Sequence, residues 1–203
     1  MNLFKRFDGS GAAGNNTKAK VKKNAYRLEL KLVFASKKLQ YHMQQLLNSN
    51  LYIGSKLDFE SLENRTNRSF SSEKGLWVYV HACKSYFDKL SPELKKNQRV
   101  VEFNKELYLD WLDLPEPDSF KVHDFIQVMD FIDKEIKDNK VLIHCDWGQS
   151  RSATLAMVYL SKKLKLLPNE FLEALSAFKN IYPDYQLPSG ISKFVGQSWN
   201  VLE

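Results

Sequence analysis

The chain has 203 residues, of which 43% are hydrophobic and 13% aromatic, which suffices for one domain with a sizeable core. Its two cysteines are too few for a disulfide-stabilised secreted domain and indicate a reducing compartment. The sequence contains no run of about 18 apolar residues, and its first residues show neither an apolar signal core nor a myristoylation glycine. We therefore expect a cytoplasmic protein without a transmembrane segment.

The net charge of +6 is concentrated near the N-terminus. Residues 1–38 carry ten basic side chains and two acidic ones, so the remainder of the chain is slightly acidic. Residues 9–16 are small and polar, with too little apolar surface to order themselves. We expect residues 1–25 to form a flexible basic arm that can attract an anionic partner, and residues 26–203 to form one folded domain.

The first half of this domain has a mixed pattern. Alternating apolar residues predict a strand over 28–34 and then a helix over 36–47, although a helix from Tyr26 onward is an alternative. Residues 51–53 are typical of a short strand that ends at Gly54, and the polar stretch 57–74 is typical of a loop. Further elements are predicted over 76–80 (strand), 84–90 (helix), 99–103 (strand) and 107–111 (strand).

From residue 119 the pattern is clearer. Apolar residues at helical spacing predict a helix over 119–136, with Ser119 as its N-cap. Residues 140–143 are typical of a strand in a buried parallel sheet. Further helices are predicted from Arg151 to about 163, from Pro168 to about 179, and after Gly190. Strands that alternate with helices predict an α/β fold with a central, mainly parallel sheet flanked by helices.

The strongest chemical signal is the segment 141–152, VLIHCDWGQSRS. A buried strand enters a short loop and the loop enters a helix, which directs backbone N–H groups and a helix N-terminus at one point and so predicts an anion site. Gly148 can adopt the positive φ that such a loop needs, and the planar guanidinium of Arg151 can hold two phosphate oxygens. The same positive field favours the thiolate of Cys145, which is the nucleophilic form.

This segment resembles the signature of the protein tyrosine phosphatase superfamily, which is His-Cys, five residues, Arg, and then Ser or Thr. Five residues match it position by position: His144, Cys145, Gly148, Arg151 and Ser152. Further stretches resemble motifs of the dual-specificity branch, namely 51–55, 131–133 and 188–191. The resemblance covers about residues 50–200 and implies that residues 26–203 form a phosphatase domain.

The resemblance also implies roles for single residues. Cys145 is expected to be the nucleophile that forms a cysteinyl-phosphate, Arg151 to hold the phosphate oxygens, and Ser152 to stabilise the departing thiolate. His144 is expected to orient the loop. The phosphate-binding loop would consist of Asp146, Trp147, Gly148, Gln149, Ser150 and Arg151. No metal or other cofactor is implied, and the four histidines show no metal-ligand spacing.

A phosphatase of this kind needs a proton donor on a separate loop. Residues 110–118 offer three aspartates, and the sequence Trp-Leu-Asp at 111–113 resembles the Trp-Pro-Asp of the family's mobile acid loop. This favours Asp113 as the general acid over Asp110 and Asp118. The alternative is an acidic entry to the following helix.

The second cysteine, Cys83, ends an apolar strand, and simple core packing is one interpretation of it. Some relatives place a cysteine at a comparable position, where it forms a reversible disulfide with the nucleophile. The resemblance therefore makes Cys83 a candidate redox partner of Cys145.

The expected function is metal-independent hydrolysis of phosphotyrosine and/or phosphoserine/threonine in proteins. The loop carries no lysine at its variable positions, and Asp146 adds negative charge, which argues against inositol lipids as substrates. The alternatives are a phosphoinositide or RNA 5′-phosphatase of the same superfamily, a non-catalytic phospho-binding module, and an adaptor that works through its basic arm.

Overall fold

A computed structural model describes residues 43–68, 77–187 and 189–202, which lie within one compact unit spanning Tyr41–Glu203. The predicted basic arm and the strand predicted over 28–34 lie outside the described residues. In the described part the sheet has six strands in the order β1-β2-β6-β3-β5-β4. The strands are β1 (Gln44–Gln45), β2 (Leu51–Ser55), β3 (Trp77–His81), β4 (Val100–Phe103), β5 (Glu106–Leu109) and β6 (Lys140–Cys145).

The centre of the sheet is parallel. Strand β6 pairs in parallel with both β2 and β3, and β3 pairs in parallel with β5, whereas the outer pairs β1-β2 and β4-β5 are antiparallel. The register places Ser55 beside Cys145 and His81 beside His144, so the carboxyl ends of three strands meet at one edge. The predicted α/β fold with a mainly parallel sheet is confirmed.

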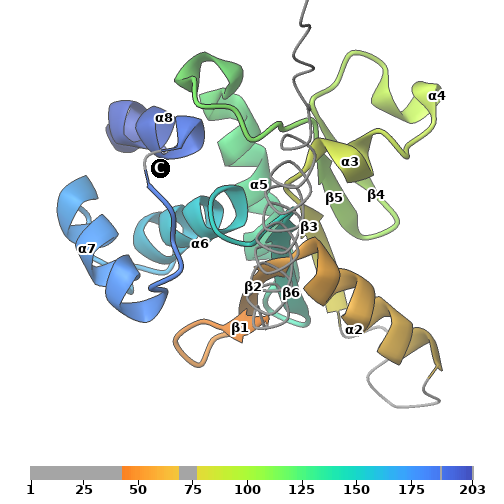
Figure 1. Cartoon of the computed structure of the whole chain (residues 1–203), viewed down its shortest axis with the longest axis horizontal. Coiled ribbons are helices and arrows are strands. Elements are labelled where there is room, and N and C mark those ends of the chain that lie inside the picture. Colours follow the sequence, from red (N-terminus) through yellow and green to blue (C-terminus); the bar gives the residue numbers. More distant parts are fainter. Residues whose placement is uncertain (1–42, 69–76, 188, 203) are drawn as a thin grey trace, which may run out of the picture. The chain divides into compact units, whose positions relative to one another are not determined.

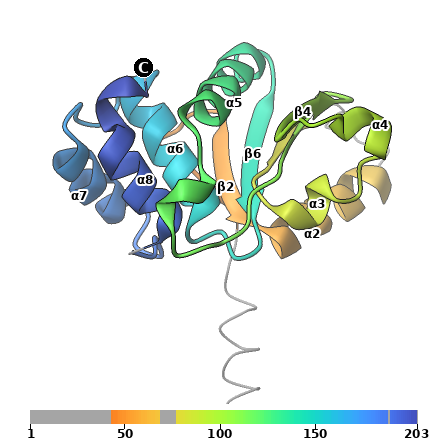
Figure 2. The same ribbon diagram turned by 90° about the horizontal axis from the view of Figure 1, so that it is seen from above.

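Helices cover both faces of the sheet, as Figure 1 and Figure 2 show. Side chains alternate along β6: Val141 and Ile143 join the main core cluster, whereas Leu142 contacts a second cluster that contains Phe59 and Tyr79. The helices are α2 (Lys56–Arg68), α3 (Lys84–Phe87), α4 (Pro92–Lys95), α5 (Val122–Glu135), α6 (Arg151–Lys162), α7 (Phe171–Ile181) and α8 (Gly190–Ser198), with 3₁₀ turns η1 (Pro117–Ser119) and η2 (Trp199–Val201). None of the helices in the described ranges is long and apolar enough to cross a membrane.

Several local predictions are wrong. The predicted loop over 57–74 is helical up to residue 68, because the polar sequence of α2 conceals a narrow apolar face: between residues 56 and 66 the buried side chains with apolar bulk are Phe59 and Leu62. Residues 44–45 form strand β1 rather than part of a helix. Ser119 lies in η1 and α5 begins after Lys121, so Ser119 is not its N-cap.

Helix boundaries elsewhere differ by a few residues from the predictions. Helix α3 ends at Phe87 rather than at residue 90, and α7 begins at Phe171 rather than at Pro168. The predicted helix after Gly190 is confirmed as α8, whose N-cap Ser189 exchanges hydrogen bonds with Ser192 in a capping box. The first turn of helix α8 contacts the segment between β5 and α5, which contains the three aspartates considered as general acid.

Candidate active site

The segment between β6 and α6 is a tight loop that starts at Cys145, where β6 ends, and enters α6 at Arg151. Gly148 has φ +80°, and a Cβ at this position would lie 3.0 Å from the carbonyl carbon of Gly54 in β2. Both conditions select glycine. The Gly148 N–H donates to Cys145 Sγ over 3.3 Å, so this amide points at the interior of the loop.

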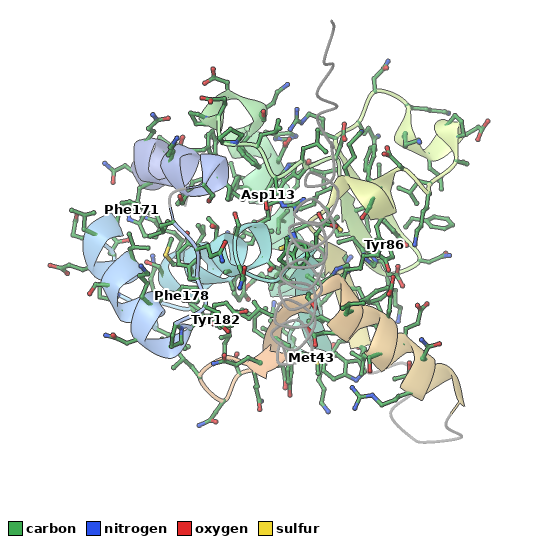
Figure 3. The ribbon with its side chains drawn as sticks, in the orientation of Figure 1. Met43, Tyr86, Asp113, Phe171, Phe178 and Tyr182 are labelled. Atoms are coloured by element: carbon green, nitrogen blue, oxygen red, sulfur yellow. The ribbon has the colours of Figure 1, made fainter. Side chains whose placement is uncertain are left out.

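Carbonyl groups of the same loop are held from outside. The Gly148 carbonyl accepts from Ser152 Oγ at 3.1 Å and from the Tyr182 hydroxyl at 3.3 Å, and the Gln149 carbonyl accepts from the Gln186 N–H at 2.9 Å. Carbonyls that point outward leave the N–H side of the loop toward its interior, as in an anion-binding nest. Figure 3 shows the labelled Tyr182 on the α7 side of α6 and Asp113 on the side of α8 and α5.

The loop also brings together three of the five residues that carry the resemblance. Cys145 is buried, and its Sγ lies 3.3 Å from Ser152 Oγ on the first turn of α6. Arg151 is 1% exposed; its Nη1 donates to the Trp111 carbonyl at 2.9 Å and its Nη2 to Asp146 Oδ2 at 2.6 Å. Its Nε is buried and has no hydrogen-bond partner among the described residues. A buried guanidinium N–H is costly to leave unpaired, and an oxyanion in the loop is a fitting acceptor.

Of the three candidate aspartates, the structure brings Asp113 to the loop. Asp113 Oδ1 accepts from Ser150 Oγ at 3.4 Å, and its Oδ2 lies 3.6 Å from Arg151 Nη2. Asp110 is instead bound to Lys84 Nζ at 2.6 Å, and Asp118 is exposed in η1. The side chain of Asp113 is 41% exposed, so it is accessible from solvent at the mouth of the loop. A pocket of about 330 Å³ opens beside it, lined among others by Leu114, Ser150 and Gln186.

Two anchors hold the segment that carries Asp113, and the sequence did not reveal either. Trp111 is buried; its carbonyl accepts from Arg151 Nη1 and from the Lys84 N–H, and its indole N–H donates to Asp124 of α5 over 3.3 Å. On the other side of Asp113, the Leu114 carbonyl accepts from the Gly190 N–H over 3.0 Å. Residues 111–116, which carry the candidate general acid and are called the acid segment, are therefore tied to Arg151 at one end and to the first turn of α8 at the other.

A buried histidine pair supports the strand that ends at Cys145. His144 Nε2 lies 2.6 Å from His81 Nδ1, and His81 Nε2 lies 2.9 Å from Glu106 Oε2. Burial lowers the pKa of His81, and burial followed by the proximity of His81 lowers the pKa of His144 well below its ordinary value of 6.5. Since a carboxylate only accepts, a neutral His81 donates from Nε2 and accepts from His144 Nε2–H. This chain of bonds fixes the ring of His144; the sequence missed it because it depends on the strand register.

Cys83 lies just beyond the end of β3 and, like Cys145, is a buried free thiol. Burial raises the pKa of Cys83 to about 11, and Ser85 Oγ lies 3.6 Å from its sulfur. The disulfide with Cys145 that the resemblance suggests stays a prediction.

Comparison with known proteins agrees with this geometry. The family model of the dual specificity phosphatase catalytic domain matches residues 35–186. Two probable dual specificity protein phosphatases of Dictyostelium discoideum are similar, one 27% identical over 58% of this chain and 59% of its own length, the other 35% identical over 43% of this chain and 20% of its own length. The chain thus spans less than two thirds of either relative.

Solved structures show the same fold. The crystal structure of human DUSP28 has a TM-score of 0.55 and 17% sequence identity, covering 79% of this chain and 94% of that one. The family model covers most of the chain and includes the whole loop from Cys145 to Arg151. The chain therefore belongs to the family of dual specificity phosphatase catalytic domains.

Proposed function

We propose that the chain hydrolyses phosphotyrosine and/or phosphoserine/threonine in proteins, without a metal ion, through a cysteinyl-phosphate on Cys145. One observation carries this proposal: the Gly148 N–H points at Cys145 Sγ, while the carboxylate of Asp113 and Arg151 Nε, which has no hydrogen-bond partner within the described ranges, reach the same loop. A nucleophile, oxyanion ligands and a proton donor thus meet at one point, which supports phosphoryl transfer.

The first step forms the covalent intermediate. The thiolate of Cys145 attacks phosphorus, and the bond between phosphorus and the ester oxygen breaks. Asp113 gives its proton to that departing oxygen, so the product alcohol or phenol leaves neutral. Arg151 and backbone N–H groups of the loop, among them the inward N–H of Gly148, hold the three remaining oxygens, whose charge they stabilise.

The second step releases inorganic phosphate. A water attacks phosphorus, the bond between sulfur and phosphorus breaks, and Asp113 takes the proton of the water. Ser152 Oγ, 3.3 Å from Cys145 Sγ, turns its hydrogen from the Gly148 carbonyl to the departing thiolate and donates to it. His144 has a positioning role. Its hydrogen bond with His81 fixes its ring, and it directly precedes the nucleophile Cys145 in the chain.

Location and regulation belong to the same proposal. Two free thiols, Cys83 and Cys145, support a cytoplasmic location.

We also propose Cys83 as the redox partner of Cys145. Peptide mass analysis after peroxide treatment should find the two cysteines linked, and oxidation of Cys145 without that link would contradict the proposal. The ten basic side chains within residues 1–38 support an anionic partner for the N-terminal arm, to be tested by deleting the arm.

The experiment that tests the function is hydrolysis of p-nitrophenyl phosphate in the presence of EDTA, with wild type beside Cys145→Ser. We expect turnover by the wild type and none by the variant, while both bind inorganic phosphate. Equal activity of the two proteins, or activity lost on chelation, would contradict the proposal. A panel of phosphopeptides, a phosphoinositide and a 5′-triphosphorylated RNA then identifies the substrate class.

A further inference from the structure

The guanidinium of Arg151 already has an anionic partner from its own loop. Phosphate is gripped side-on by the edge that Nε and Nη2 form together. Here Asp146 Oδ2 lies 2.6 Å from Nη2, whereas Nε on the same edge is buried and has no partner among the described residues. Nη1 is turned away, since it donates to the Trp111 carbonyl. One half of the phosphate-gripping edge is thus occupied by a carboxylate and the other half is open.

Asp146 has little else to bind. Its other oxygen, Oδ1, lies 3.5 Å from Ser85 Oγ, and its side chain is 40% exposed at the rim of the loop. Asp113 Oδ2 lies 3.6 Å from the same Nη2, so two carboxylates share one guanidinium nitrogen. Lys84, next to Ser85 in sequence, is committed to other carboxylates, at 2.6 Å from Asp110 and 3.2 Å from Asp88.

We propose that Asp146 is a specificity-determining residue that selects phosphorylated side chains flanked by a basic residue. The argument rests on the proposed phosphatase function of the loop. A phosphate that takes the Nε and Nη2 edge displaces Asp146 from Nη2 and leaves its carboxylate beside a new anion. A lysine or arginine next to the phosphorylated residue gives that carboxylate a cation again, whereas a glutamate there adds a third repelling charge.

Apolar side chains of the acid segment favour the same class of substrate. Leu112 and Leu114 are exposed, and they offer apolar surface to the aliphatic stem of a lysine or arginine.

The test compares two phosphopeptides that differ in one residue beside the phosphorylated side chain, arginine in one and glutamine in the other. With wild type we expect kcat/KM to be about threefold to fivefold higher for the arginine peptide, an effect that added salt should weaken. Asp146→Asn should abolish the difference and lower the inhibition constant of inorganic phosphate, because the nearer of the two carboxylates beside Nη2 loses its charge and only Asp113, at 3.6 Å, remains. Asp146→Lys should turn the preference toward a glutamate-flanked peptide.

The matched control is Asp88→Asn, which removes the same charge from an exposed carboxylate that contacts Lys84 instead of Arg151. We expect this control to keep both the arginine preference and the affinity for phosphate of the wild type. An arginine preference that survives in Asp146→Asn, or a wild type that treats both peptides alike, would overturn the proposal.

Binding separates this inference from the function on which it rests. If no substrate is turned over, calorimetric titration with inorganic phosphate and with the two phosphopeptides still measures how strongly Asp146 competes with phosphate for Arg151. Tighter phosphate binding by Asp146→Asn without turnover would support the inference and contradict catalysis. Turnover together with equal phosphate affinity of wild type and Asp146→Asn would support catalysis and contradict the inference.

Discussion

Gly190 at the start of α8 is predicted to control the position of Asp113, the proposed general acid. A Cβ at this residue would lie 2.3 Å from the Leu114 carbonyl oxygen and 2.6 Å from the Glu116 carbonyl oxygen, both in the backbone of the acid segment. Backbone cannot swing aside as a side chain can, so Gly190→Ala must push this segment away by about 1 Å to reach ordinary contact distance. Asp113, directly before Leu114, moves with it.

A displacement of that size should cost proton transfer more than nucleophilic attack. A misplacement of about 1 Å lowers the rate of a positioned step by about 10²-fold. We therefore expect kcat of Gly190→Ala for phenyl phosphate, a poor leaving group, to fall by about 10²-fold, and kcat for p-nitrophenyl phosphate to fall much less. Combined with Asp113→Asn, the substitution should cause little further loss, because both act on the same proton.

Gly196→Ala is the matched control on the same helix. A Cβ at Gly196 would lie 2.9 Å from Phe171 Cε1, a side-chain atom that can move aside. Phe171 lies outside the acid segment. Near wild-type activity is expected. The reasoning is refuted if Gly190→Ala slows both esters equally, or if Gly196→Ala shows the same dependence on the leaving group.

Three further predictions concern the loop and its support. Asp113→Asn should lower kcat for phenyl phosphate by about 10²–10⁴-fold in steady-state assays, and a larger loss in Asp110→Asn would reassign the acid. Ser152→Ala should slow breakdown of the intermediate, so that stopped-flow traces show a burst of p-nitrophenol; a slower burst with unchanged steady-state rate would contradict the role of the hydroxyl. Because burial holds the pKa of His144 well below 6.5, the unfolded chain takes up a proton below pH 6.5 that the folded chain excludes. The free energy of unfolding in urea should thus fall as pH drops from 6.5 to 5, by up to about 1.4 kcal/mol per pH unit from this histidine, and less steeply in His144→Asn; equal slopes would contradict this.

The chemical centre could be predicted from sequence because it is local. The strand, the nucleophile, the glycine and the arginine lie within residues 141–152, and β6 and α6 appear where the pattern places them. The fold class followed from the same alternation of strands and helices. Asp113 could be singled out from sequence because it stands in a short segment with few carboxylates; the structure places it beside the loop, and its role as general acid stays a prediction.

The rest depended on contacts between distant parts of the chain. Helix α2 was missed because its apolar face is narrow, and Phe59 becomes a core residue only against Tyr79 and Leu142 of the sheet. The link between His81 and His144 depends on the parallel register of β3 and β6, and the requirement for glycine at Gly190 depends on a carbonyl 76 residues earlier in the chain, at position 114. The contact of Asp146 with Arg151 is local, but its preference for Nη2 is a matter of side-chain geometry that residue types do not specify.

The most direct test of the account is to trap the intermediate. Wild-type protein would be mixed with p-nitrophenyl phosphate, quenched in acid within milliseconds, digested and analysed by mass spectrometry. The account predicts a phosphoryl group on the sulfur of Cys145, present during turnover, more abundant in Ser152→Ala and absent in Cys145→Ser. Sustained turnover with no phosphorylated peptide in either wild type or Ser152→Ala, or a phosphoryl group on another residue, would contradict it.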